Sequence, residues 1–239
     1  MPLASNLLQN LPAERPDNRR SLLLVVAFLA WVVVVQALVA ATAGIELSEE
    51  VIASAERKYG PEARTRLQAW IKLIASSRKR PEDDKLKIVN DFFNQVPFAS
   101  DIDHWGIADY WATPVELLAS NGGDCEDYAI GKYFTLLALG IDINKLRITY
   151  VKAPQAPNPA DQSHMVLTYY AKPDSIPLVL DNLIPEIRPA SLRKDLTPVY
   201  SFNGDGLWLA KERGSGRVGG SEKISLWTQL NARMGKELQ

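Results

Sequence analysis

Residues 121–128 read Asn-Gly-Gly-Asp-Cys-Glu-Asp-Tyr and contain Cys125, the only cysteine in the chain. An apolar helical pattern follows from Ala129 to Leu139 and is closed by Gly140. A cysteine where a loop enters a helix lies beside outward-pointing backbone N–H groups and the positive end of the helix dipole, and both favour a thiolate. We therefore interpret Cys125 as a nucleophile.

The acidic neighbours of Cys125 support this interpretation. A lone cysteine is usually a small buried hydrophobic residue. Here Asp124, Glu126 and Asp127 surround it, and three carboxylates are unsuited to an apolar core.

Length and composition limit the alternatives. The chain has 239 residues and a formal net charge of −1. This length allows one domain of roughly 190 residues with a full core, and the charge gives no support to a nucleic-acid partner. A single cysteine excludes an internal disulfide and a cysteine-rich zinc site. Only His104 and His164 are available as the base of a cysteine–histidine pair.

The N-terminal region predicts export. Residues 1–20 are polar and end in two arginines, and residues 21–43 are almost wholly apolar. A run of this length approaches the roughly 20 residues that span a bilayer, and the basic flank places residues 1–20 in the cytoplasm. Ala-Thr-Ala at 41–43 matches a signal-peptidase site. Residues 21–43 are thus a cleaved signal peptide or an uncleaved membrane anchor, and both place residues 45–239 in the periplasm of a Gram-negative cell.

Residues 45–120 have a helical pattern. Ser48, Pro61 and Pro81 each mark a helix start. Residues 98–112 are expected to form a loop. Thr-Pro-Val-Glu at 113–116 is a capping box that begins a short helix before residue 121.

After Gly140 the pattern changes to strands. We expect strands at residues 146–151, 163–170, 177–181, 199–202 and 207–210, with a hairpin turn at 203–206. A Gly/Ser-rich stretch at 213–221 precedes a short terminal helix. Helices followed by an antiparallel meander are typical of the α+β class.

This order of elements predicts a catalytic triad. Cys125 begins a helix, His164 lies on the next long strand, and Asp181 ends the strand after that. Neighbouring antiparallel strands would bring His164 and Asp181 side by side, with the imidazole as base and the carboxylate as its orienting partner. Alone, His164 is equally well a satisfied strand histidine and Asp181 a turn carboxylate. His104 is the rival base, ranked lower because it precedes the nucleophile and lies in an expected loop.

The carboxylates beside Cys125 present a physical problem, since negative charge raises the pKa of a thiol and suppresses the thiolate. A hard divalent cation would neutralise them, and Ca²⁺ takes oxygen ligands in flexible geometry. Asp124 and Glu126 flank the cysteine, so such an ion would also fix the helix start. The alternative is a solvated acidic helix N-terminus. The spacing of an EF-hand loop is absent.

Four segments carry a family resemblance. They are Asp-Tyr-Trp-Ala-Thr-Pro-Val-Glu at 109–116, Gly-Gly-Asp-Cys-Glu-Asp-Tyr-Ala at 122–129, Ser-His-Met-Val-Leu at 163–167 and Leu-Asp-Asn at 180–182. Together they resemble the bacterial transglutaminase-like cysteine proteases, and among these the periplasmic LapG-type proteases. The resemblance covers most of residues 45–235.

The resemblance implies a papain/transglutaminase-like fold, in which N-terminal helices and the nucleophile helix pack on an antiparallel sheet. It implies a Cys125, His164 and Asp181 triad, and a calcium site at Asp124 and Glu126 with Asp127 as a further candidate. The implied substrate is a large repeat adhesin, cut near its N-terminus at a small-residue site so that the biofilm disperses. The implied partner is an inner-membrane cyclic di-GMP receptor that sequesters the protease.

Two other functions are compatible with the same residues. A transglutaminase or acyltransferase would pass the acyl group from the cysteine to an amine instead of water. A non-catalytic, membrane-tethered interaction module would keep the triad only as a remnant.

Overall fold

The computed structural model describes residues 45–154, 162–209 and 217–237. They belong to Gly44–Gln239, one of the two units into which the chain divides. The predictions for residues 1–20 and 21–43 lie outside the described residues. Within the described ranges, no helix is both long enough and apolar enough to cross a membrane.

The helices begin where the sequence provides caps. The Ser48 hydroxyl accepts a hydrogen bond from the backbone N–H of Val51. Thr113 and Glu116 form the expected capping box, in which each side chain accepts from the backbone N–H of the other residue. The helices are α2 (Glu49–Tyr59), α3 (Pro61–Ser77), α4 (Glu82–Phe93), α5 (Asp101–Trp105), α6 (Pro114–Ser120), α7 (Cys125–Ala138) and α8 (Ser225–Glu237).

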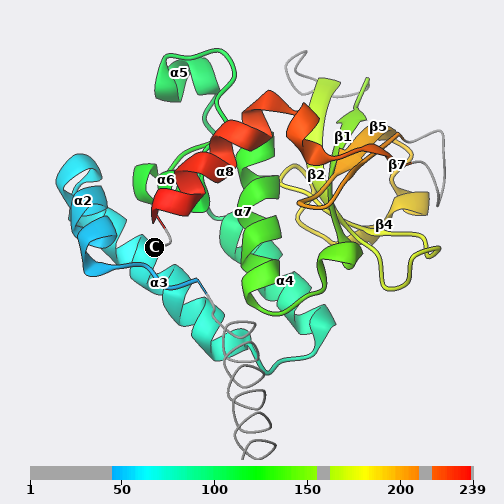
Figure 1. The fold of residues 1–239 in the computed structure, drawn as a ribbon. Coiled ribbons are helices and arrows are strands. Elements are labelled where there is room, and N and C mark those ends of the chain that lie inside the picture. Colours follow the sequence, from blue (N-terminus) through cyan, green and yellow to red (C-terminus); the bar gives the residue numbers. More distant parts are fainter. Residues whose placement is uncertain (1–44, 155–161, 210–216, 238–239) are drawn as a thin grey trace, which may run out of the picture. The chain divides into compact units, whose positions relative to one another are not determined.

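The strands of the described residues form a seven-stranded antiparallel sheet in the order β4-β3-β2-β1-β5-β6-β7 (Figure 1). They are β1 (Leu146–Lys152), β2 (Ser163–Tyr169), β3 (Leu178–Leu180), β4 (Arg188–Pro189), β5 (Thr197–Phe202), β6 (Leu207–Leu209) and β7 (Arg217–Gly219). Short 3₁₀ helices lie at η1 (Ile143–Lys145), η3 (Ala190–Leu192) and η4 (Ser221–Lys223).

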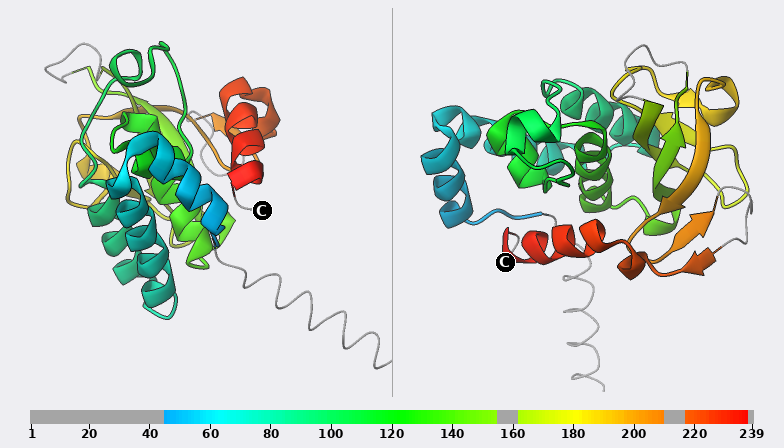
Figure 2. Two further views of the ribbon diagram at one scale, coloured as in Figure 1. Left: turned by 90° about the vertical axis from the view of Figure 1, so that its left-hand side faces the viewer. Right: turned by 90° about the horizontal axis from the view of Figure 1, so that it is seen from above.

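Helix α7 lies at the centre of the core. It packs on β2 and β1, and α4 and α6 pack against it. Figures 1 and 2 show α3, α4, α6 and α7 gathered on the same side of the sheet. Trp70 of α3 is fully buried, and its indole N–H donates a 2.8 Å hydrogen bond to Thr135 of α7. Because α7 is held by helices and by the sheet, its first residue, Cys125, is fixed beside β2.

The predicted α+β class and the packing of the nucleophile helix on the sheet are confirmed. The structure corrects the prediction of a loop at residues 98–112, because this segment contains α5. The Ser100 hydroxyl caps that helix by accepting from the backbone N–H of Asp103.

The short strands β4 and β7 were not predicted. They are two and three residues long and pair with the outer edges of β3 and β6. Strands this short carry too little alternation to be recognised in a sequence. Each forms because a neighbouring strand offers unpaired backbone groups.

Candidate active site

The loop before α7 is shaped by close packing at its two glycines. A Cβ atom at Gly122 would lie 2.7 Å from Cε1 of His104, and one at Gly123 would lie 2.5 Å from Oδ2 of Asp127. Both separations are too short for real atoms, so side chains are excluded at these positions. The loop can therefore pack closely against its neighbours, and Cys125 then occupies the first position of α7.

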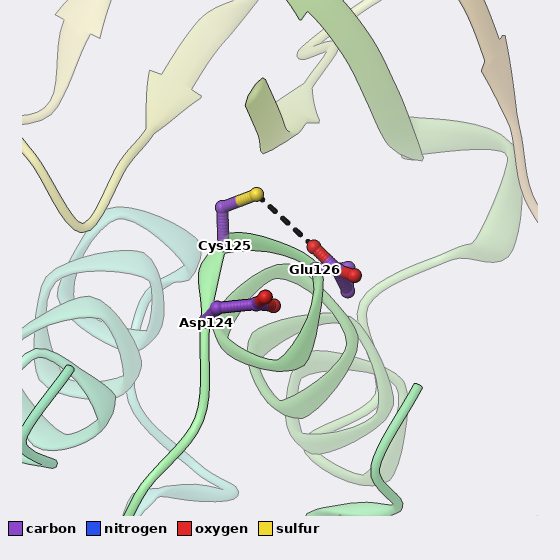
Figure 3. Close-up of side chains that lie close together, drawn as sticks. All are labelled: Asp124, Cys125 and Glu126. Carbon is purple, nitrogen blue, oxygen red and sulfur yellow. Dashed lines mark hydrogen bonds between the residues drawn. The ribbon is translucent and has the colours of Figure 1, made fainter. Parts of the chain in front are cut away.

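Cys125 is partly buried, and its thiol donates a 3.1 Å hydrogen bond to the Glu126 carboxylate (Figure 3). Burial raises the pKa of the Cys125 thiol well above its ordinary value, and the negative charges of Glu126 and Asp124 raise it further. The backbone N–H of Met165 acts in the opposite direction by hydrogen-bonding the sulfur. The predicted conflict between the thiolate and its acidic neighbours is therefore present in the folded chain.

His164 and Asp181 are adjacent and buried. His164 is 2% exposed and Asp181 is 1% exposed. Nε2 of His164 and Oδ1 of Asp181 are 2.8 Å apart. The strand register accounts for this contact, because β2 pairs Leu167 with Leu180 and continues past the end of β3. Asp181 is the first residue after β3 and meets the extended part of β2.

The structure thus brings His164 and Asp181 into contact, and it packs α7, which begins at Cys125, against β2, the strand that carries His164. Met165, whose backbone N–H lowers the pKa of the Cys125 thiol, is the residue next to His164 on β2. His164 in turn contacts Asp181. In acyl-transfer enzymes, a thiol, an imidazole and a carboxylate that contact one another in this order act as nucleophile, base and orienting group.

His104, the rival base, has a different environment. It lies on α5 and not in a loop as expected, and its Nε2 is 2.8 Å from the Ser120 hydroxyl of α6. Its ring contacts Trp105 edge-on. These contacts hold α5 against the end of α6, and the geometry therefore favours His164 as the base.

Five carboxylates gather around the start of α7: Asp101, Asp109, Asp124, Glu126 and Asp127. They form overlapping groups, two of which are Asp101–Asp124–Asp127 and Asp101–Asp109–Glu126. In each group the oxygen atoms that could act as ligands all lie within 4.8 Å of one another. Figure 3 shows the Asp124 and Glu126 side chains extending to the same side of the helix start.

The chemistry of this cluster suits a hard divalent cation. Oδ1 of Asp101 and Oδ1 of Asp124 are buried without a hydrogen-bond partner. Burial raises the pKa of Asp101 to about 6, and it also raises the pKa of Asp124, which Glu126 raises further. Buried carboxylates that crowd one another need a positive charge. Ca²⁺ prefers carboxylate oxygens in this kind of flexible arrangement, so the residues present fit the ion.

Asp127 is placed differently from the other four. It is fully buried, and its Oδ1 accepts a 2.7 Å hydrogen bond from the backbone N–H of Ala112. Its Oδ2 accepts a 3.3 Å bond from the N–H of Asp124. Both oxygens therefore hold backbone around the helix start, although Oδ atoms of Asp127 also lie close enough to Asp101 and Asp124 to share a cation.

Sequence reasoning missed Asp101 and Asp109. Both belong to the segment expected to be an irregular loop, and only the folding of α5 brings them to α7. A signal for the helix was present, because Ser-Asp-Ile-Asp at 100–103 has the spacing of a capping box. No signal in the sequence showed that the two carboxylates turn toward Cys125.

Comparison with known families agrees with this geometry. The family model described as bacterial transglutaminase-like cysteine proteinase matches residues 67–194. That range includes all three members of the predicted triad. A search of curated protein sequences finds no significant match.

Solved structures of LapG from Legionella pneumophila are similar to the chain along most of its length. One is 44% identical, covers 80% of this chain and 99% of its own, and has a TM-score of 0.67. The EGTA-treated form is 44% identical, with coverages of 80% and 100% and a TM-score of 0.69. The calcium-bound form is 45% identical, with coverages of 79% and 99% and a TM-score of 0.67.

Proposed function

Because the chain belongs to the family of bacterial transglutaminase-like cysteine proteinases, we propose that it is a calcium-dependent cysteine endopeptidase acting through Cys125, His164 and Asp181. The single observation that carries the proposal is the buried His164–Asp181 pair beside the Cys125 helix. A remnant of a lost active site would not be expected to keep a 2.8 Å hydrogen bond between two buried polar groups.

In the proposed mechanism, the Cys125 sulfur attacks the carbonyl carbon of the scissile peptide bond while His164 takes the thiol proton. The hydrogen bond to Asp181 assigns the proton of the neutral ring to Nε2. Nδ1 is then the nitrogen that accepts the thiol proton and later gives it to the leaving amine. Water, activated by the same nitrogen, hydrolyses the thioester and restores the thiol.

Backbone N–H groups at the start of α7, including that of Cys125, would stabilise the oxyanion of the tetrahedral intermediate. They lack partners within the helix and lie at its positive end. Donors of this kind act on charge that develops only during the reaction.

Asp124, Glu126, Asp101 and Asp109 would hold the calcium ion. The ion would supply positive charge where the carboxylates crowd one another. Asp124 and Glu126 would then no longer oppose a thiolate on Cys125. Support comes from the unpartnered oxygens of Asp101 and Asp124 and from the similar LapG described as calcium-bound.

We further propose that the substrate is an extended segment near the N-terminus of a large repeat adhesin. Two exposed apolar side chains support an extended peptide as the ligand. Phe98 is 52% exposed and pairs through its backbone with Gly123, and Leu183 is 43% exposed and follows Asp181 by two residues. Phe98 thus lies beside the loop that leads to Cys125, and Leu183 lies beside the His164–Asp181 pair, so both offer apolar contacts to an unfolded segment.

The location and the regulation belong to the same proposal. The apolar run at residues 21–43 supports export to the periplasm, as a free or a membrane-anchored enzyme. The family resemblance supports restraint by an inner-membrane cyclic di-GMP receptor and a role in biofilm dispersal. Mass spectrometry of the protein recovered from cells would decide whether residues 1–43 remain, and co-purification with the receptor would test the restraint.

The decisive experiment uses the purified protein and the N-terminal region of a co-encoded large adhesin, with calcium and with a chelator. Removing Cys125 (C125A) or the base (H164Q) is expected to lower kcat by roughly 10³-fold or more. H104Q is the matched control and should retain activity, because His104 contacts Ser120 instead of the triad.

The outcomes separate the alternatives. Cleavage by C125A at the wild-type rate would refute the peptidase, and equal activity of H164Q and wild type would refute His164 as the base. Activity that is unchanged in the chelator removes the calcium requirement alone. A product with the mass of an added amine, formed when an amine donor is present, would indicate an acyltransferase.

A further inference from the structure

Arg193 lies directly behind the proposed triad. It follows the short helix η3 and is 3% exposed. One of its terminal nitrogens, Nη2, donates a 2.8 Å hydrogen bond to Oδ2 of Asp181, whose side chain is completely buried. The triad carboxylate is therefore held on one side by His164 and on the other by a guanidinium.

The two oxygens of Asp181 have separate partners. Oδ1 accepts from Nε2 of His164 and, at 3.0 Å, from the backbone N–H of Leu183. Oδ2 accepts from Arg193. Since a carboxylate turns about a single soft torsion, fixing Oδ2 also fixes the direction in which Oδ1 points. The Arg193 contact thus sets the plane in which the imidazole is held.

Arg193 is itself fixed. Its Nε donates to Oδ1 of Asp195 at 3.0 Å, and its Nη2 donates to Oδ2 of Asp195 at 2.7 Å. This two-point contact uses the planar fork of the guanidinium. The Asp195 side chain is 40% exposed, so water solvates its charge and it does not require a buried counter-ion. The pair therefore orients Arg193 toward Asp181.

The charge of Arg193 also matters at this depth. Burial alone would raise the pKa of Asp181, but hydrogen bonds from His164, Leu183 and Arg193 hold it at about 2. His164 also acts on Asp181 through its charge, and Lys132 of α7 interacts electrostatically with the same carboxylate. Arg193 contacts the carboxylate at Oδ2, on the side away from His164, so it contributes both charge and direction.

We propose that Arg193 is a positioning residue for the reaction, which holds Asp181 in the orientation that keeps the His164 ring directed at Cys125. This inference rests on the proposed function, since it assigns a role within the same triad. Arg193 touches neither the substrate nor the reacting atoms. Its effect should therefore appear in kcat and not in KM.

A cavity gives access to Arg193 from the face of the sheet opposite α7. It has a volume of about 590 Å³, and Arg193, Thr168 and Val179 are among its walls. Arg147 lines the same cavity, where its guanidinium stacks 4.1 Å from the ring of Trp208 and has no contact with the triad. The cavity offers a path for a small cation to the position of Arg193, and Arg147 offers a matched control.

The kinetic test compares R193A, R193K and R147A in the full-length protein. We expect R193A to lower kcat by roughly 10²-fold, the loss typical of a misplaced catalytic group, with KM unchanged. R193K keeps the charge without the fork and should lie between R193A and wild type. R147A should keep the wild-type kcat. Guanidinium ion, at concentrations far below those that unfold proteins, should restore part of the activity of R193A and none of that of C125A.

A spectroscopic test needs no substrate. The chain has only two histidines, so ¹⁵N-histidine labelling gives two sets of ring signals, and H104Q assigns them. We expect the Nε2–H proton of His164 to be visible and protected from exchange in wild type and R147A, and to be lost or broadened in R193A and R193K.

These readouts separate a failure of the proposed function from a failure of the positioning role of Arg193. If wild type does not cleave the adhesin segment, the proposed function fails, while the ring signals still decide whether Arg193 holds the His164–Asp181 pair. If wild type cleaves and both Arg193 variants match its kcat and its ring signals, the positioning role is wrong. If R193A does not fold, R193K against R147A decides the question by the same two measurements.

Discussion

At the scale of single residues, Cys125 is subject to opposing influences. Its place at the start of α7 and the N–H of Met165 favour the thiolate. Burial, Glu126 and Asp124 favour the thiol more strongly, so the pKa of Cys125 is raised. The raised pKa favours the thiol when no ion is bound, so in the proposed mechanism proton transfer to His164 accompanies the attack of the sulfur.

Lys132 is a second residue whose charge is disfavoured. It lies on α7, is 1% exposed, and burial lowers its pKa to about 7, although Asp181 and Asp91 act against that shift. Between about pH 7 and the ordinary lysine pKa of 10.5, Lys132 is therefore protonated in the unfolded chain and neutral in the folded chain. Stability must rise with pH across this window, because the unfolded state binds more protons there.

Replacing Lys132 with methionine should remove that rise. We expect K132M to be more stable than wild type by about 1 to 4 kcal/mol near pH 7, the range found when buried charges are replaced by apolar groups. The difference should shrink toward pH 10. Urea unfolding at several pH values measures both effects. K87M is the control, since Lys87 is 73% exposed, and its curve should stay parallel to wild type. If the free energy of unfolding of K132M changes with pH in the same way as that of wild type, Lys132 is not the group that titrates.

At the scale of elements, α7 and α4 approach closely at Gly131. A Cβ atom there would lie 2.5 Å from Cε1 of Phe93. Alanine is the better helix former, but the contact with α4 leaves no room for its methyl group. The packing of the two helices therefore outweighs helix propensity at this position.

We expect G131A to lower the free energy of unfolding by about 1 to 3 kcal/mol, the usual range for overpacking. F93L should relieve the clash, so G131A should cost less in the F93L background than in wild type. G235A in α8 is the control: nothing lies within 4 Å of its added methyl group, and the substitution should stabilise by about 0.5 to 1 kcal/mol. Chemical unfolding measures all four variants. A stabilising G131A would contradict the close approach.

Elements with strong local signals could be predicted from the sequence. Thr113 and Glu116 cap α6 as expected, and Asn203 turns the hairpin between β5 and β6 by accepting from Gly206 N–H through its side chain. These signals act over three or four residues. Helix α5 was missed because its five residues bury little and it is held by distant partners, such as the Ser120 contact of His104.

At the scale of the whole molecule, the contact between His164 and Asp181 could be predicted, but its surroundings could not. The order of elements was enough to pair His164 with Asp181, because antiparallel neighbours joined by a turn must meet. Arg193 lies 12 residues after Asp181 in the sequence, and Asp101 lies 23 residues before Asp124. Both reach the site from segments outside the predicted motifs. Such contacts depend on tertiary packing, and no local pattern in the sequence specifies them.

The carboxylate cluster joins two such segments. Asp101 and Asp109 come from α5 and the loop after it, while Asp124 and Glu126 belong to the start of α7. An ion that binds only the folded arrangement adds about 2.7 kcal/mol at a hundredfold excess over its Kd. For a domain of this size that raises Tm by roughly 5 to 10 °C.

Thermal unfolding with calcium and with a chelator should show this difference in wild type, and D124N or D101N should abolish it. In the chelator both variants should unfold at a higher temperature than wild type, because each removes a buried carboxylate from a crowded cluster. D103N, an exposed neighbour on α5, should keep the calcium response. D127A should unfold earlier in both conditions, since Asp127 supports the backbone of Ala112 and Asp124. If D127A keeps the calcium response, Asp127 is not a required ligand, and if D124N keeps that response, the ion binds elsewhere.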